Sequence, residues 1–458
     1  MAKTYKKNAR NVFAIPLYAR IWFWELTLMF LASLTTSGFI AVSVYLKLPI
    51  WLFLTCIVLW LLVAILLSIH VYLLFRGISK SGSLKKYFVE SSSEKSVTKS
   101  LLATMSVNRL QDTPYISVPA VRVGVSLPSH ITVEVEKLAG MYDIDKMTED
   151  IDSSFRGKLG AYAVTSSRIT DDGLFYKFVL EDKGTDKTWR PATIELMKQE
   201  SHEIKLQKGL TINLADKPHI IAWGKSGSGK SSLIFSIILQ LFLSGSEMYF
   251  IDPKNEFSAF KEFYPANRIA EDTEPILTIL RHVCEELKER QRIVAKAVRE
   301  RQEIGLRGYD IGLTPVVLIA DEIGSAVASM DSKQKKEFLA LLTQIVQKGR
   351  SVSVFCVIAT QSPKTDTTLS SDIRSQFATK ILLGSASGET QRMAFDGEVA
   401  TKGGVDRFKG FYISDGKTDE TPLSFAVTDL HKYNLNRLEC FKRAYEIGLE
   451  LDQDKKAT

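Results

Sequence analysis

GKSGSGKSS, residues 224–232, is a run of glycine, serine and lysine that satisfies the pattern GxxxxGK[ST]. It stands between HIIAW at 219–223, which predicts a short buried strand, and SSLIFSIILQLFL at 231–243, which predicts a helix. Glycines let such a loop wrap so that backbone N–H groups face phosphate oxygens, and the following helix adds the positive end of its dipole. The strand, loop and helix together predict a site for the phosphates of a nucleotide.

The nucleotide expected at this loop is ATP with Mg²⁺. Lys230 is predicted to reach the β and γ phosphates, and the hydroxyl of Ser231 to hold the metal ion. A chance glycine-rich turn is the alternative, but it does not require this flanking pattern. The residues expected to bind the nucleotide are Gly224, Lys225, Ser226, Gly227, Ser228, Gly229, Lys230, Ser231 and Ser232.

Polar residues end two further apolar runs. In VVLIADE at 316–322 a strand delivers Asp321 and Glu322 to the carboxyl edge of the expected sheet, where ligands bind in open α/β folds. Asp321 fits a Mg²⁺ ligand, and Glu322 fits the base that orients or deprotonates an attacking water. An acidic helix N-terminus is the plainer interpretation of the pair. Gln361 closes the strand VSVFCVIATQ at the same edge, where its amide is expected to sense the γ-phosphate or the water.

Strands followed by long helices dominate the sequence after Leu206, which predicts a parallel sheet covered on both faces. The region 206–430 is therefore expected to be an α/β P-loop ATPase domain, and 431–458 a C-terminal helix and tail. Before it, 105–205 reads as a small α+β domain with a hairpin around the Asp172-Gly173 turn, and we expect an assembly role for it. The stretch 77–104, rich in serine and lysine, is expected to be a flexible linker.

The first 86 residues predict a membrane anchor. The runs 26–46 and 49–75 contain no Asp, Glu, Lys or Arg, and each is long enough to cross a hydrocarbon core of about 30 Å. They form the predicted two-helix hairpin at 21–76. Lysine and arginine crowd its outer flanks, including the basic N-terminus at 1–20, so both termini and the ATPase domain are expected in the cytoplasm.

The overall charge of +7 comes from these membrane flanks, so it does not by itself indicate a basic DNA-binding face. The four cysteines stand singly, and the six histidines show no metal-ligand spacing. Neither disulfides nor a zinc site are expected.

Four motifs together resemble the motor domain of the FtsK/SpoIIIE DNA translocases. They are the phosphate loop preceded by KPHIIAW, IDPKNEF at 251–257, the VVLIADE strand, and QKGRSVSVFCVIATQSP at 347–363. In that family an IDPK follows the second strand, and a segment of the form KARAxGIHLVLATQRPS leads to the sensor glutamine. The resemblance covers roughly residues 205–425. It implies a RecA-like fold.

The layout departs from the cell-division translocases, with two predicted membrane helices in place of about four and no long linker or winged-helix domain in this sequence. It is similar to the FtsK-like coupling proteins of Gram-positive conjugative elements. That resemblance implies a membrane-anchored hexamer with nucleotide between subunits and sequence-nonspecific DNA in the pore, together with relaxase and transfer-channel partners. Lys364 and Arg374 are candidate pore residues, although a solvated loop explains them nearly as well.

Arg350 matches the second basic residue of the family's KARA segment. The resemblance implies a finger that reaches the γ-phosphate held by the neighbouring subunit, whereas a helix-ending arginine often serves only the dipole. Two other functions stay open: an FtsK-like ATPase that drives protein secretion of type VII, and a membrane scaffold whose nucleotide site holds a conformation. The presence of Glu322 speaks against the scaffold, because a site that only binds needs no base.

Overall fold

The structure is a computed structural model of the 458-residue chain. It describes residues 3–6, 35, 37–38, 45, 50–108, 115–126, 130–138, 144–156, 159–182, 184–361, 363, 369–397, 399–401, 406–416, 418 and 421–457. The chain divides into two compact units, Met1–Gly184 and Thr185–Thr458. Each unit is described by itself.

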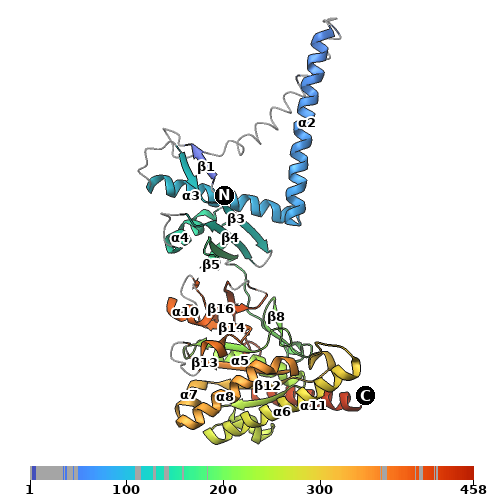
Figure 1. Ribbon diagram of the computed structural model, residues 1–458, viewed down its shortest axis with the longest axis vertical. Helices are drawn as coiled ribbons and strands as arrows, with labels where there is room; N and C mark the ends of the chain where they lie inside the picture. Colours follow the sequence, from blue (N-terminus) through green and yellow to red (C-terminus); the bar gives the residue numbers. More distant parts are fainter. Residues whose placement is uncertain are drawn as a thin grey trace. The chain divides into compact units, whose positions relative to one another are not determined.

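An eight-stranded sheet forms the centre of the second unit, in the order β11-β10-β12-β13-β9-β14-β16-β17. Figure 1 labels its strands β12, β13, β14 and β16. The first six strands of this order run parallel, and β16 and β17 are antiparallel. The bounds are β9 Ile220–Gly224, β10 Glu247–Ile251, β11 Ile269–Ala270, β12 Val316–Asp321, β13 Val354–Thr360, β14 Thr379–Leu383, β16 Lys409–Ser414 and β17 Leu423–Ala426. The parallel sheet expected from the apolar runs is thus confirmed.

Helices cover both faces of this sheet, and its central strands consist mainly of apolar residues. Every residue of β9, β12 and β13 is buried, as in parallel sheets packed on two sides. On one face α6 and α8 bury side chains such as Leu280 and Phe338 against the strands. On the other, Phe242 of α5 contacts Tyr445 of α11. The helices are α5 Lys230–Leu243, α6 Thr273–Arg301, α7 Ile323–Ala328, α8 Ser332–Lys348, α9 Ser371–Arg374, α10 Gly388–Phe395 and α11 Leu438–Ala457.

The second unit begins about twenty residues earlier than the expected boundary at 205/206. Its first strands, β7 (Glu203–Gln207) and β8 (Leu210–Asn213), form a hairpin. The side chain of Gln240 in α5 accepts a hydrogen bond from the N–H of Lys205 at 2.8 Å and donates one to its carbonyl at 3.1 Å. These bonds fasten the hairpin to the sheet domain, which places it there.

The first unit is built on an antiparallel sheet with the neighbouring strands β5-β6-β4-β3. The hairpin of β5 and β6 is the one that the sequence predicted around Asp172-Gly173. A further pair, β1 with β2, is also antiparallel. The bounds are β1 Lys3–Lys6, β2 Tyr115–Val118, β3 Val121–Ser126, β4 His130–Glu136, α4 Ile144–Ser154, β5 Tyr162–Ile169 and β6 Phe175–Asp182.

The expected flexible linker at 77–104 is wrong, because helix α3 (Leu84–Asn108) occupies most of it. Val97, Leu101 and Leu102 are buried in the core of the first unit, together with side chains of the sheet and α4. Ser93 of the same helix is also buried, whereas Leu84 and Phe88 are exposed. A composition typical of linkers thus conceals a helix, which packs on the core of the first unit through a few buried side chains.

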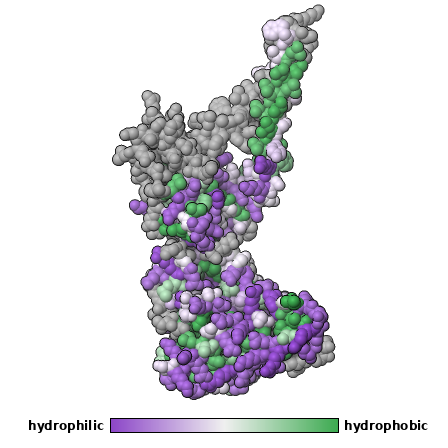
Figure 2. Space-filling view, viewed as in Figure 1, coloured by the Kyte–Doolittle hydropathy of each residue, from purple (hydrophilic) through white to green (hydrophobic). Residues whose placement is uncertain are grey.

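Helix α2 (Ile50–Ser81) follows the predicted membrane turn. Apolar side chains gather along it (Figure 2), and Trp51, Ile57 and Leu66 are exposed. Most of the first predicted membrane segment, 26–46, lies outside the described residues. Within the described part of the chain, no helix is long and apolar enough to cross a membrane.

Candidate functional site

The phosphate loop runs from the end of β9 into α5, at the carboxyl edge of the parallel strands. Two glycines are required by close approach. A Cβ on Gly224 would collide with Ser228 Oγ and stand 3.0 Å from the carbonyl of Leu383. Gly229 has φ 109°, and a Cβ there would stand 2.7 Å from the ring of Phe408. The loop therefore keeps its shape only with glycine at these positions.

Lys230 lies folded back across the loop, where its Nζ donates a hydrogen bond to the carbonyl of Gly224 at 2.6 Å. Burial lowers the pKa of this amine, and the negative charges of Glu322 and Asp321 oppose the change. The site thus holds a buried cation whose only hydrogen bond in the described residues is to a carbonyl.

The residues present fit a phosphate group with Mg²⁺. Lys225, Ser226 and Gly227 are exposed at the loop, while the hydroxyl of Ser228 is buried without a hydrogen-bond partner among the described residues. The first turn of α5, Lys230 to Ser232, offers backbone N–H groups that have no partner inside the helix. Ser231 at this turn and the carboxylate of Asp321 are oxygen ligands of the kind that Mg²⁺ takes together with phosphate oxygens.

Asp321 and Glu322 end β12 at the same edge, and the structure brings them close enough to Lys230 for both to affect its pKa. Burial and the negative charge of Glu256 together raise the pKa of Asp321 to about 6, although the positive charge of Lys230 opposes the change. Glu322 adopts φ 57°, a left-handed conformation that is uncommon for this residue type. Its N–H donates to the carbonyl of Ala359 at 2.8 Å, which fixes the strained backbone between β12 and α7.

A cation that the sequence analysis left without a role, Lys254, contacts the candidate base. Its Nζ lies 3.0 Å from Oε2 of Glu322. Lys254 sits in the IDPKNEF turn after β10, where the buried carboxylate of Asp252 accepts hydrogen bonds from the N–H groups of Glu256 at 2.8 Å and Phe257 at 2.7 Å. The IDPK motif was the only feature of the sequence that singled out Lys254. Nothing in the sequence indicated which side chain Lys254 would contact.

Gln361 directly follows β13 and is exposed. Ala359 pairs with Asp321 in the register of β12 and β13, so Gln361 lies beyond the same edge of the sheet as the two carboxylates. The strand register is thus consistent with the expectation that Gln361 lies at the same edge of the sheet as Glu322.

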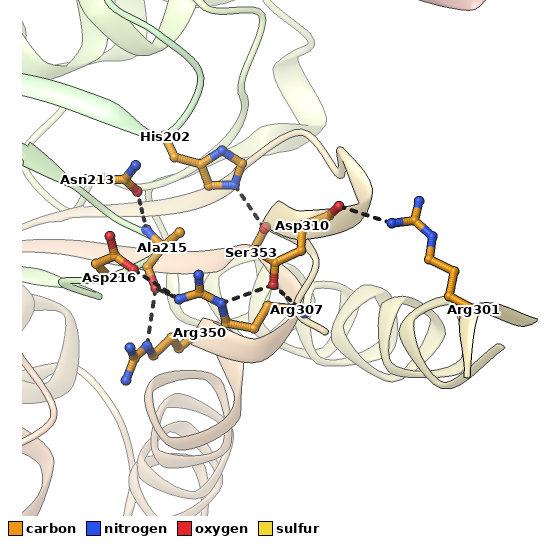
Figure 3. Close-up of polar contacts among 9 residues, drawn as sticks. All are labelled: His202, Asn213, Ala215, Asp216, Arg301, Arg307, Asp310, Arg350 and Ser353. Atoms are coloured by element: carbon orange, nitrogen blue, oxygen red, sulfur yellow. Dashed lines mark hydrogen bonds and ion pairs between the residues drawn. The ribbon is translucent and has the colours of Figure 1, made fainter. Parts of the chain in front are cut away.

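Arg350 lies at the opposite edge. It belongs to the 3-10 turn Gly349–Val352, which precedes β13, and its Nε donates to the carbonyl of Ala215 at 3.2 Å (Figure 3). Because β13 has seven residues, each rising about 3.3 Å, roughly 20 Å separates Arg350 from the phosphate edge of its own subunit. In the described residues Arg350 makes no ion pair, whereas Arg307 on the same carbonyl pairs with Asp216 and Asp310.

The two candidate pore residues are placed differently. Lys364 lies outside the described residues. Arg374 ends the short helix α9, and its Nη1 donates to the carbonyl of Leu369 at 2.8 Å. The guanidinium of Arg374 therefore caps its own loop in this structure.

The phosphate loop, the paired acidic residues and the parallel sheet define a P-loop ATPase domain of the α/β class. Residues 177–310 match the sequence profile of the FtsK/SpoIIIE family. The chain thus carries an FtsK-like domain, as the four motifs indicated.

Two curated relatives show the same likeness. The FtsK domain-containing protein YdcQ of Bacillus subtilis is 27% identical over 196 residues, which cover 43% of this chain and 40% of the relative. The DNA translocase FtsK of Streptococcus pyogenes is 27% identical over 216 residues, which cover 42% of this chain and 25% of the relative. The chain spans less than half the length of these two relatives.

Solved structures with a similar fold include the conjugation coupling protein TcpA of pCW3 in its monomer form with ATPγS. It is 14% identical, covers 73% of this chain and 93% of its own, and gives a TM-score of 0.46. EssC ATPases 2 and 3 from Geobacillus thermodenitrificans are 15% identical, and the match covers 59% of this chain and 52% of the EssC chain. The TM-score is 0.42. Both scores lie below 0.5, so the assignment of an FtsK-like domain stands on the sequence match.

Proposed function

We propose that this protein is a membrane-anchored ATPase that moves DNA, and that it delivers DNA to a conjugative transfer channel. The observation that carries the proposal is the convergence of Lys230, Asp321 and Glu322 at one edge of an FtsK-like sheet. A binding scaffold needs the phosphate loop but has no use for a buried carboxylate positioned as a base. The curated relatives named DNA translocases support the cargo.

Each residue of the site takes one role in hydrolysis. Lys230 would leave the Gly224 carbonyl and bind the β and γ phosphates. Ser231 and Asp321 would hold Mg²⁺, whose positive charge would help to neutralise the phosphates. Glu322 accepts the proton of the attacking water. Gln361, beyond the end of the neighbouring strand, orients that water or senses the γ-phosphate.

Arg350 supports an assembly with sites between subunits. The guanidinium lies at the edge opposite its own phosphate loop and carries a positive charge that no described acid neutralises. A planar guanidinium so placed can reach a neighbour's γ-phosphate, and a ring of subunits, which we propose to be a hexamer, gives every site such a neighbour. DNA would pass through the pore on sequence-independent phosphate contacts, from Lys364 and Arg374 among others.

The anchor and the partners complete the proposal. The charge-free runs 26–46 and 49–75, together with the exposed apolar side chains of α2, support a membrane hairpin with both termini and the ATPase domain in the cytoplasm. The part of the 105–205 region that belongs to the first unit, which ends at Gly184, would mediate assembly. We further propose that a relaxase and transfer-channel proteins are its partners.

The test is ATP hydrolysis by the full chain in detergent, with and without duplex or single-stranded DNA of arbitrary sequence. DNA is expected to stimulate hydrolysis, and rising salt is expected to weaken that stimulation, because the contacts to phosphate release counterions. Glu322→Gln serves as the control for contaminating ATPases. Stimulation by a secreted protein and none by DNA would instead favour protein secretion, as in the type VII alternative.

A further inference from the structure

A segment far along the chain lies against the phosphate loop. Strand β16 is antiparallel to β14, so its first residues stand at the same edge as the carboxyl ends of the parallel strands. The N–H of Gly384, after β14, donates to the carbonyl of Lys409 at 2.8 Å. The two residues before Lys409 therefore meet the loop after β9.

Two contacts join this segment to the loop. The Nε of Arg407 donates to the carbonyl of Gly227 at 3.0 Å, and the N–H of Phe408 donates to the carbonyl of Ser228 at 3.0 Å. The ring of Phe408 occupies the space that a Cβ on Gly229 would need. The segment therefore contacts three consecutive residues of the phosphate loop, on its carbonyl side.

Phe408 has φ 63°, a left-handed conformation that is an outlier for a bulky aromatic residue. Its carbonyl accepts the N–H of Val427 at 2.8 Å, so both sides of the residue are fixed by backbone hydrogen bonds. Strain of this kind persists only when the surroundings impose it, and it gathers at ligand sites. Its effect here is to project the neighbouring Arg407 side chain over the loop.

The guanidinium of Arg407 retains unused donors. Nη2 lies 3.6 Å from the position of a Cβ on Gly227, while the bond from Nε is the only hydrogen bond of this guanidinium within the described residues. Arg407 is exposed, and none of its described contacts is an ion pair. A positive charge is thus held beside the loop with its terminal nitrogens free to bind an anion.

We propose that Arg407 binds a phosphate oxygen of the nucleotide from within its own subunit, and that Phe408 positions it. This inference rests on the proposed nucleotide site. It adds a second arginine, distinct from Arg350, whose charge acts in cis on binding and does not depend on a neighbouring subunit.

The experiment measures the dissociation constant of ATP with Mg²⁺ for the full chain in detergent, together with the unfolding midpoint of the nucleotide-free protein. Arg407→Ala is expected to weaken binding about tenfold or more, since a hydrogen bond to a charged group is lost. Arg407→Lys, which keeps the charge but not the planar fork, is expected to recover part of the affinity. Both variants should keep the parent's nucleotide-free midpoint.

Lys409→Ala is the matched control. Lys409 is an exposed cation two residues away that pairs with Asp406 at 2.9 Å, and its variant is expected to bind ATP like the parent. Parent-like affinity in Arg407→Ala would overturn the proposal, and so would a weaker affinity that comes with a lower nucleotide-free midpoint. Lys230→Ala separates this inference from the proposed function: if that variant binds ATP normally, the nucleotide site itself is wrong.

Discussion

The ammonium of Lys254 lies 3.0 Å from a carboxylate oxygen of Glu322, so the proposed base is held by an ion pair from the turn after β10. The side chain of Glu322 is 8% exposed and that of Lys254 is 38% exposed. A nearly buried carboxylate without a partner is costly, which explains why a lysine from another loop meets it. The pair also connects the IDPK motif to the catalytic edge. We expect it to loosen when Mg²⁺ and ATP change the charge around Glu322.

A double-mutant cycle measures this pair. Lys254→Met, Glu322→Gln and the double variant are compared with the parent by denaturant unfolding without nucleotide. A coupling of about 1 kcal/mol is expected, since solvent screens the lysine in part. The exposed pair of Lys261 and Glu271 offers a control cycle with a smaller coupling. Additive effects at Lys254 and Glu322 would contradict the proposed pairing.

Substitutions of Lys230 and Glu322 are expected to impair different steps of the ATPase reaction. Lys230→Ala removes the cation over the phosphates and should abolish ATP binding. Glu322→Gln keeps the shape of the side chain but loses the base, so ATP should still bind while kcat falls about 10²-fold or more. Nucleotide binding and single-turnover hydrolysis distinguish the two. Hydrolysis at the parent's rate in both variants would refute the assignment of the site.

Arg350 is expected to act on the neighbouring subunit. Arg350→Ala alone should lower hydrolysis by ~10³-fold. A mixture with Lys230→Ala should regain some activity, at interfaces where an intact loop meets an intact arginine. Arg292→Ala, which removes an exposed arginine from α6, is the control and should stay fully active. No recovery in rings shown to contain both variants would exclude action in trans.

Acid is expected to destabilise the ATPase unit through His219. This side chain is fully buried, its Nδ1 accepts the N–H of Cys356 at 2.9 Å, and its Nε2 donates to the carbonyl of Val346 at 2.9 Å. Burial lowers the pKa of His219 from 6.5 to about 4. Between these values only the unfolded chain takes up the proton, so stability falls as pH drops below about 6.5.

The measurement is denaturant unfolding at pH 7.5 and pH 5. The parent should lose about 2 kcal/mol more than His219→Asn over this interval. Asparagine tolerates the φ of 63° at this position and can accept the Cys356 N–H. The variant of an exposed histidine, His431→Asn, is the control. Equal pH profiles in the parent and His219→Asn would contradict the buried neutral imidazole.

Membrane topology is tested independently of the motor. An epitope inserted at Leu48 should be reached by an impermeant label from outside the cell, and a reporter after Thr458 should report the cytoplasm, because lysines and arginines flank the two charge-free runs. Labelling at Leu48 only after permeabilisation would refute the hairpin.

The sequence by itself determined the phosphate loop, the parallel sheet and the edge of the sheet at which Asp321, Glu322 and Gln361 lie. These features follow from local rules: GxxxxGK[ST] requires a tight loop, continuous apolar runs favour buried parallel strands, and parallel strands bring their carboxyl ends to one edge. The four motifs that indicated an FtsK-like domain also lie within such local stretches. The predictions from sequence therefore match the structure best where residues that are close in the sequence are also close in space.

Only the tertiary structure decided which distant residues meet. Lys254 reaches Glu322 from 68 positions away, and Arg407 reaches Gly227 from 180 positions away. Most of the serine- and lysine-rich stretch at 77–104 is helical, and its Val97 and Leu101 are buried in an apolar core. The composition of the stretch does not reveal this packing. Contacts of this kind depend on strand order and side-chain packing, and neither is encoded in any one local pattern.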